Sequence, residues 1–327
     1  MCGEYQIEVY NKRVHYKITV RRNITILRGD SGTGKTTLIN MIDAYDAGDT
    51  SSVTVKCTDD IPCGVLDRRS WKYQLKEEKP HIYFADESCS FIYTEEFAKS
   101  LGSCGHYFVF ATRHEAKLAM LPYSVNEIYN LKVTGKYPVQ KRMITVNEVE
   151  PLVYNDVVEK PITVCQIMTE DTKSGYEFFT LVSGGNCITA GGKSQVPEML
   201  CRLQKPTLVV VDGAAFGNEF EKVLRLYSVL PCFCVFYFPE SFEWFLLHSR
   251  MFAHYKMLHR KLSNPSKYID CAKYISWERY FTDLLKEYSG KLGFSYTKGN
   301  RLNSQFYSLD NQIYLKNKLL PSVKFKF

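Results

Sequence analysis

The apolar positions of the first 150 residues form short runs that predict buried strands, separated by segments whose apolar residues recur at helical spacing. The predicted strands cover residues 24–27, 81–86, 106–112 and 126–132, and the predicted helices begin near residue 37 and cover 93–101. We expect residues 50–78 to add one helix and a short hairpin, which would be built from 53–57 and 64–66. Alternating strands and helices predict an α/β fold.

The pattern begins again after residue 161. Strands are predicted at 162–168, 186–189, 207–212 and 232–238, with helices at 174–182, 194–203 and 216–227 and a further helix after 240. This alternation predicts a second parallel sheet, and parallel sheets bind ligands at the carboxyl ends of their strands. We place the domain boundary near 145–160, which divides the chain into 1–150, a smaller α/β domain at 151–250, and a helical, basic C-terminal extension at 251–327.

The composition is that of a folded chain, with 45% hydrophobic and 24% charged residues. No run approaches the roughly 20 apolar residues of a membrane span. The N-terminus lacks the apolar segment of a signal peptide, so we expect a cytoplasmic protein without a membrane partner. The eleven cysteines are scattered without CxxC pairs, which predicts free thiols.

Positive charge is concentrated at the C-terminal end. Residues 250–327 carry 15 Lys and Arg against 5 Asp and Glu, while the net charge of the whole chain is +7. This excess, interleaved with Tyr and Phe, indicates either attraction to DNA or RNA or an ordinary solvated surface. The expected contacts are Lys298, Arg301, Lys316, Lys318, Lys324 and Lys326. The sequence leaves a homo-oligomer open.

The most specific motif lies between the first predicted strand and helix. Residues 29–36 read GDSGTGKT and match the phosphate-binding pattern GxxxxGK[ST], or Walker A motif, in its required strand–loop–helix context. Glycines allow backbone N–H groups to surround a triphosphate, Lys35 would reach the β- and γ-phosphates, and the Thr36 hydroxyl would coordinate Mg²⁺. We therefore expect ATP and Mg²⁺ as ligands. The expected binding residues are Gly29, Asp30, Ser31, Gly32, Thr33, Gly34, Lys35, Thr36 and Thr37.

A second candidate element is the strand that ends in Asp86 and Glu87. In a Walker B element, Asp86 would hold Mg²⁺ and Glu87 would polarise the attacking water, whereas a strand that merely stops at two acids would do neither. The order strand, Asp-Glu, helix, strand, Thr-x-His resembles ABC-type and SMC-like ATPases. The resemblance implies that His114 contacts the γ-phosphate, with Thr112 or Arg113 as a nearby sensor. No LSGGQ-like signature lies before Asp86, which indicates a reduced P-loop ATPase.

Acidic residues follow three predicted strands of the second half, at Glu170, Asp212 and Glu240. They indicate either a divalent metal site at one sheet edge or ordinary helix caps. The order strand–Glu, then strand–Asp, resembles the Toprim fold of topoisomerases, primases and overcoming-lysogenisation-defect nucleases. The resemblance implies that Glu170 and Asp212 bind Mg²⁺. Ala214 stands where that family has a second aspartate. Asp171 or Glu240 would have to supply the metal ligand that this alanine lacks.

Two functions from different classes follow. The first is an ATPase whose Toprim-like domain binds or acts on nucleic acid, a pairing that implies an anti-phage or mobile-element role. The second is an ATP-sensing regulatory module whose inactive Toprim-like domain recruits a protein partner. A small-molecule kinase fits less well, because Asp86 and Glu87 suit hydrolysis and only Arg68 and Arg69 form an arginine pair nearby.

Overall fold

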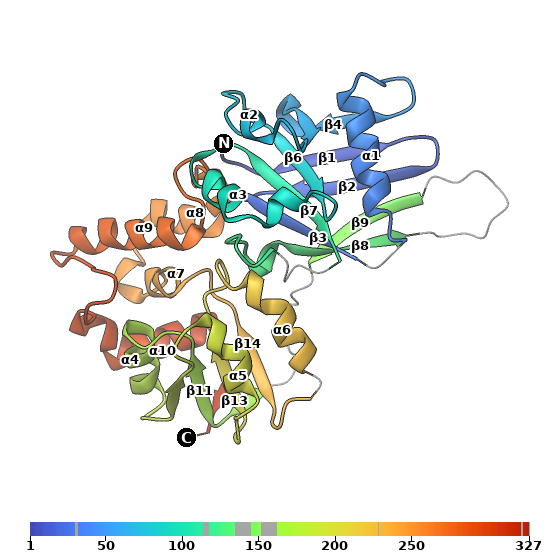
Figure 1. Cartoon of the computed structure of the whole chain (residues 1–327). Helices are drawn as coiled ribbons and strands as arrows, with labels where there is room; N and C mark the ends of the chain where they lie inside the picture. The colour runs from blue at the N-terminus through green and yellow to red at the C-terminus, as the bar shows by residue number, and fades with distance from the viewer. Residues whose placement is uncertain are drawn as a thin grey trace. The chain divides into compact units, whose positions relative to one another are not determined.

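The computed structural model of this protein describes residues 1–29, 32–113, 118–134, 145–151, 162–227, 229–321 and 323–326 (Figure 1). The chain divides into two compact units. The first unit comprises Met1–Tyr154 and Asn264–Ile275, and the second comprises Asn155–Ser263 and Ser276–Phe327. Residues 251–327, which we expected to form a separate extension, are thus shared between the two units. None of the helices in the described ranges has the length and apolar character needed to cross a bilayer.

The first unit is built on a nine-stranded sheet with the order β4-β1-β2-β9-β8-β3-β7-β6-β5. Its half from β8 to β5 is parallel, while β1 pairs antiparallel with β2 and β4, and β8 pairs antiparallel with β9. The strands are β1 (Tyr5–Tyr10), β2 (Val14–Val20), β3 (Ile24–Arg28), β4 (Thr54–Cys57), β5 (Cys63–Val65), β6 (Ile82–Asp86), β7 (Tyr107–Thr112), β8 (Ile128–Thr134) and β9 (Thr145–Pro151).

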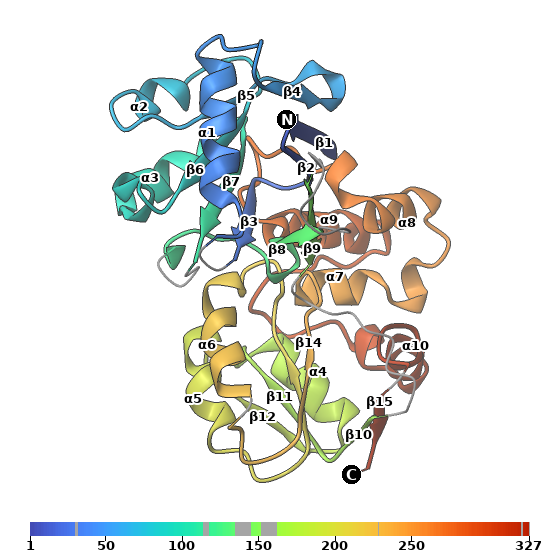
Figure 2. The same cartoon turned by 90° about the vertical axis from the view of Figure 1, so that its right-hand side faces the viewer.

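The hairpin predicted within residues 50–78 is wrong. The strand β4 pairs with β1, and β5 pairs with β6, at opposite edges of the sheet. Only residues 58–62 connect these two edge strands, and helix α1 (Lys35–Asp46) packs against both. The sheet therefore curves around α1 (Figure 2). The Leu38 and Ile42 side chains of this helix are fully buried.

Helices cover both faces of the parallel half of the sheet, and alternate side chains of β7 pack against opposite faces. Val109 packs in the same core cluster as Leu38 of α1. The intervening Phe108 and Phe110 place their rings 6.4 and 6.0 Å from the ring of Phe97, which belongs to helix α3 (Glu95–Ser100). Burying a phenylalanine of this kind contributes about 1.5–3 kcal/mol. A third helix, α2 (Trp71–Gln74), places its Trp71 ring edge-on to Phe97, with the ring centroids 5.4 Å apart.

The second unit is built on a four-stranded parallel sheet with the order β12-β11-β13-β14. Residues 162–168, predicted as one strand, form two strands in different sheets, because the first part pairs with the C-terminal strand. The strands are β10 (Ile162–Val164), β11 (Gln166–Thr169), β12 (Cys187–Thr189), β13 (Thr207–Val210), β14 (Cys234–Tyr237) and β15 (Val323–Phe325).

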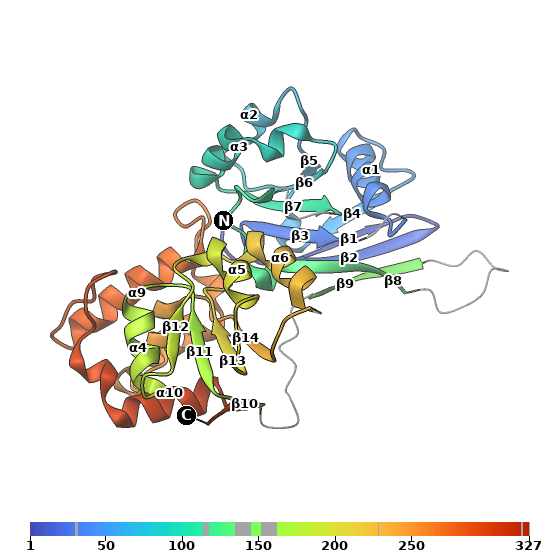
Figure 3. The same cartoon turned by 60° about the horizontal axis from the view of Figure 1, so that its bottom comes forward.

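Helices cover both faces of this sheet. Figures 2 and 3 show α5 (Val196–Leu200) and α6 (Gly217–Tyr227) on one face, with α4 (Ser174–Val182) and α10 (Leu309–Leu319) on the other. Helix α7 (Phe242–Leu247) packs against α9 (Trp277–Lys291), and α8 (Lys256–Ser263) precedes the return of the chain to the first unit. The aromatic residues of α9 are buried.

Candidate functional site

The glycine-rich loop of the first unit lies between β3 and α1, as its motif predicts. Gly32 and Gly34 have φ angles of 84° and 93°, a left-handed conformation that favours glycine. Gly34 is also the N-cap of α1, where no side chain caps the first backbone N–H groups. Those N–H groups and the positive end of the helix dipole make this helix start suited to an anion. Asp30 and Ser31, which we also expected to bind, lie outside the described residues.

Lys35 is held against the loop itself. Its side chain is buried, and Nζ donates hydrogen bonds to the Gly29 carbonyl and, at 3.2 Å, to Thr33 Oγ1. The hydroxyl of the fully buried Tyr16 donates a hydrogen bond of 3.0 Å to the Gly34 carbonyl. These hydrogen bonds hold the described part of the loop and the buried Lys35, the first residue of α1, in place.

The acidic pair lies at the carboxyl end of β6. The Ser88 backbone N–H donates to Asp86 Oδ1 at 3.0 Å, which orients that carboxylate. The Glu87 carboxylate is held through both oxygens by Arg113, which follows β7. The distance is 3.0 Å from Arg113 Nε to Oε1 and 3.2 Å from the Arg113 backbone nitrogen to Oε2.

One cavity of about 220 Å³ joins the loop to the acidic pair. Its walls are residues 32–37, Asp86, Glu87, Ala111 and Arg113. The carboxyl edge of the parallel sheet brings these segments together, because β7 lies between β3 and β6. The Thr36 hydroxyl and the Asp86 carboxylate on this wall are oxygen ligands of the kind that Mg²⁺ prefers, so the site fits that ion. Gly29 is not part of this wall, and His114 lies outside the described residues.

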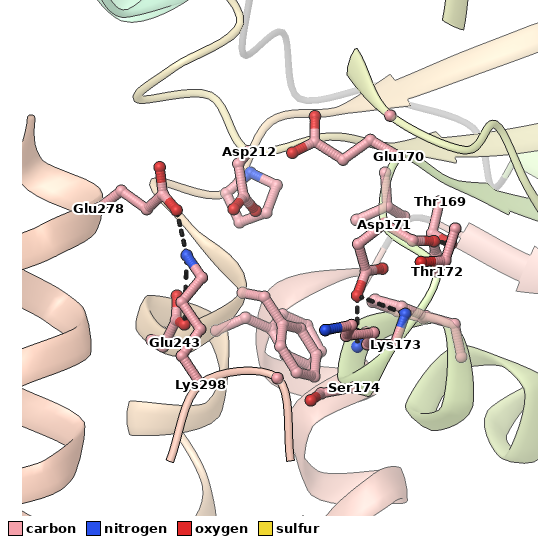
Figure 4. Close-up of a pocket in the computed structure, with 18 of the residues that line it drawn as sticks. Thr169, Glu170, Asp171, Thr172, Lys173, Ser174, Asp212, Glu243, Glu278 and Lys298 are labelled. Carbon is pink, nitrogen blue, oxygen red and sulfur yellow. Dashed lines mark hydrogen bonds and ion pairs between the residues drawn. The ribbon is translucent and has the colours of Figure 1, made fainter. Parts of the chain in front are cut away.

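A second cavity, of about 420 Å³, opens at the carboxyl edge of the sheet in the second unit (Figure 4). The chain leaves β11 for β12 on one side and then returns to β13 on the other, so the strand order reverses between β11 and β13. Ligands of open α/β sheets bind at such a point. Glu170 follows β11, Asp212 follows β13, and both line the cavity. The other lining side chains include Asp171, Lys173, Phe179, Phe242, Glu243, Phe245, Glu278, Tyr296 and Lys298.

Burial perturbs the two predicted acids. It raises the pKa of the Glu170 carboxyl to about 7, and repulsion from Glu278 adds to the effect. The pKa of Asp212 is raised well above its usual range, first by burial and then by repulsion from Glu170. The Glu170 Oε2 atom is buried and has no hydrogen-bond partner among the residues that the structure describes. Two close acids that share a low-dielectric site both favour the protonated form.

In the other half of the cavity, one lysine partly offsets the charge of two carboxylates. Figure 4 shows the Lys298 ammonium between the carboxylates of Glu243 and Glu278. Glu243 is only 2% exposed, and its Oε1 accepts a hydrogen bond of 2.9 Å from the Tyr296 hydroxyl. Glu278 was not predicted from the sequence, because an acid just after a helix N-cap is ordinary. Lys298 was predicted to contact phosphate, whereas in the structure it pairs with these carboxylates.

A glycine pair forms another wall of the same cavity. Gly191 and Gly192, with φ angles of 84° and 139°, follow β12 and lead into the short helix α5. Lys193 donates a hydrogen bond of 3.0 Å to the Ala215 carbonyl, and its charge lowers the pKa of Glu170 in partial opposition to burial. This segment forms a turn before a helix.

The acids of the second unit form only part of the metal site that the Toprim resemblance implies. Glu240 does not line the cavity, and its backbone carbonyl accepts a hydrogen bond of 3.1 Å from Ala214. Within the described parts of the chain, no group of three or more His, Cys, Asp or Glu side chains is placed to hold a metal ion. Of the two acids expected to replace the missing aspartate, Asp171 lines the cavity with Glu170 and Asp212, and Glu240 does not.

Comparison with protein-family models, with curated proteins and with solved structures found no match to this chain. The functional argument therefore rests on the geometry of the two cavities.

Proposed function

We propose that the first unit binds ATP with Mg²⁺ in the 220 Å³ cavity and hydrolyses it. The observation that carries this proposal is the convergence of the glycine-rich loop and the acidic pair, Asp86 and Glu87, on one cavity from two separate segments of the chain. A structural turn and an unrelated strand end would have no reason to share a cavity. The buried Lys35 supports the same assignment, because a phosphate oxygen can replace its present loop acceptors.

Each residue then has a chemical role. Backbone N–H groups of the loop and the Lys35 ammonium bind the β- and γ-phosphates. Mg²⁺, held by Thr36 and through water by Asp86, would offset the negative charge of the phosphates. Glu87 orients a water molecule and accepts its proton as the water oxygen bonds to the γ-phosphorus and the bond to the β–γ bridging oxygen breaks. ADP and inorganic phosphate leave the site. His114 remains the expected γ-phosphate contact.

The test is the rate of ATP hydrolysis by Glu87→Gln. The amide cannot accept the proton, so we expect hydrolysis to slow by roughly 100-fold or more while ATP still binds. Glu96→Gln, which removes an exposed carboxylate on α3 of the same unit, is the matched control and should hydrolyse ATP at the wild-type rate. A wild-type rate in Glu87→Gln would remove this residue from the mechanism.

For the second unit, we propose that it binds or acts on DNA or RNA and that the nucleotide state of the first unit controls it. The perturbed acids at the switch point of a parallel sheet support a functional cavity there, because shifted pKa values are concentrated at such sites. The basic C-terminal residues support an anionic ligand. An anti-phage or mobile-element role remains what the family resemblance implies.

Two observations favour the alternative, an ATP-sensing module whose second unit is an inactive adaptor for a protein partner. Ala214 replaces the expected aspartate, and no metal-holding group occurs among the described residues. We therefore derive no metal-dependent step in this unit. Cleavage of DNA or RNA that is lost in the Glu170→Gln, Asp212→Asn double variant would favour the nuclease, and the absence of cleavage would favour the adaptor.

A further inference from the structure

The one carboxylate that the proposed hydrolysis needs free is already bound in this structure. Arg113 contacts both oxygens of Glu87, one through its guanidinium at 3.0 Å and the other through its backbone N–H at 3.2 Å. The contact follows from the sheet, since β6 and β7 are parallel neighbours and Asp86 pairs with Ala111. The residues just beyond this pair, Glu87 and Arg113, are thus brought to the same edge.

This ion pair is easily exchanged. Arg113 is 52% exposed and Glu87 is 32% exposed, so water competes with the pair. Exposed ion pairs bias an equilibrium by no more than about fivefold. A terminal phosphate carries more negative charge than a carboxylate and accepts two hydrogen bonds from a guanidinium. Arg113 also lines the same cavity as the loop that would hold the phosphates, so the guanidinium needs to turn only within that cavity.

We propose that Arg113 is a positioning residue that holds Glu87 in the nucleotide-free protein and exchanges it for the γ-phosphate when a triphosphate binds. This inference rests on the proposed function of the first unit. The exchange is non-covalent, with a guanidinium moving from one anion to another. While the pair persists, both carboxylate oxygens of Glu87 contact Arg113, so the carboxylate is not available to a water molecule. ADP lacks the γ-phosphate and leaves the pair intact, so Arg113 makes the base available only when the substrate is present.

The test is a double-mutant cycle on ligand affinity rather than on turnover. The four proteins are the wild type, Glu87→Gln, Arg113→Ala and the double variant. Isothermal titration measures the affinity of each, with Mg²⁺, for a non-hydrolysable ATP analogue and for ADP. Glu87→Gln removes the competing anion, so we expect it to tighten analogue binding by about two- to fivefold. Arg113→Ala should weaken analogue binding by roughly 10- to 100-fold and leave ADP affinity within about twofold.

The decisive comparison is the effect of Glu87→Gln in the Arg113→Ala background. If Arg113 links the two anions, the tightening by Glu87→Gln disappears there. If Glu87 simply repels the γ-phosphate, the tightening is the same in both backgrounds, and the proposal is overturned. The proposal is also overturned if Arg113→Ala weakens ADP binding as much as it weakens analogue binding.

The Lys72–Glu96 ion pair supplies the control. It is an exposed pair of the first unit that does not line the cavity, with 55% and 62% of the two side chains exposed. Lys72→Ala and Glu96→Gln should leave both affinities unchanged. If the wild type binds neither the analogue nor ADP, both the proposed function and this inference are wrong. If it binds but the effects of Glu87→Gln and Arg113→Ala on analogue affinity are additive, only the inference is wrong.

Discussion

At the scale of single residues, burial raises the pKa of the Glu170 and Asp212 carboxyls, which line the second cavity. The pKa of Glu170 is raised from 4.5 to about 7, chiefly by burial. An acid with a raised pKa binds its proton more tightly in the folded protein than in the unfolded chain. Its contribution to stability is therefore complete below pH 4.5 and is lost as the pH rises to about 7.

This shift predicts a pH-dependent stability difference between the wild type and a Glu170→Gln, Asp212→Asn double variant. Between pH 5 and pH 8 the wild type should lose on the order of 2–3 kcal/mol relative to the variant, which cannot titrate at these positions. Asp212 shifts in the same direction and adds to the loss. Calorimetric melting temperatures at several pH values measure the difference. If the melting temperatures of the two proteins change equally with pH across this range, the two acids are not protonated in the fold.

The residues that form the two cavities were predictable to different extents. In the first cavity, the motif and the strand that ends in Asp86 and Glu87 identify the wall, because each signal is local in sequence. The contact between Glu87 and Arg113 was not predicted, since it depends on the pairing of β6 with β7. In the second cavity, Glu278 lies far along the chain from Glu170, and nothing near it in the sequence marks it.

At the scale of elements, local pattern identified most strands and helices, but it did not identify their partners. The β-branched run of β3 and the helical spacing of α1 predicted those elements closely. By contrast, β4 and β5 pair with strands distant from each other, although they look like a hairpin in the sequence. The break at Cys165 has the same origin, since β10 pairs with β15 at the far end of the chain.

The C-terminal elements can be tested for nucleic-acid binding only by point substitution. Truncation would remove α10 and β15, and with them the buried Leu315 and the partner of β10. It would therefore damage the fold as well as remove charge. Three exposed lysines, Lys318, Lys324 and Lys326, offer an alternative, and Lys298 does not, because it is paired inside the cavity.

We expect the Lys318→Gln, Lys324→Gln, Lys326→Gln triple variant to bind duplex DNA with a weaker salt dependence. If all three contact phosphates, the slope of log affinity against log salt should flatten by up to about 2.7, or 0.9 for each contact. Fluorescence anisotropy at several salt concentrations measures the slope. Lys12→Gln, Lys76→Gln, Lys79→Gln removes the same charge from exposed positions of the first unit and should change the slope little. Equal slopes in the two triple variants would assign the basic C-terminal residues to the solvated surface.

At the scale of the whole molecule, the two units place their cavities at the carboxyl edges of parallel strands. In the first, phosphate-binding geometry and an acidic pair share one cavity. In the second, perturbed acids line a larger one. The chain thus pairs a candidate nucleotide site with a candidate effector site, and control of the second by the first depends on whether the first binds a nucleotide.

The measurement that tests this account most directly is equilibrium binding of Mg²⁺-ATP to the wild type and to Lys35→Ala. The wild type should bind, and Lys35→Ala should bind roughly 10- to 100-fold more weakly, because a charged hydrogen-bond donor to the phosphates is lost. Lys99→Ala, which removes an exposed ammonium from α3 of the same unit, should bind like the wild type. No binding by the wild type, or equal affinity in Lys35→Ala, would contradict the assignment of this cavity as the ATP site.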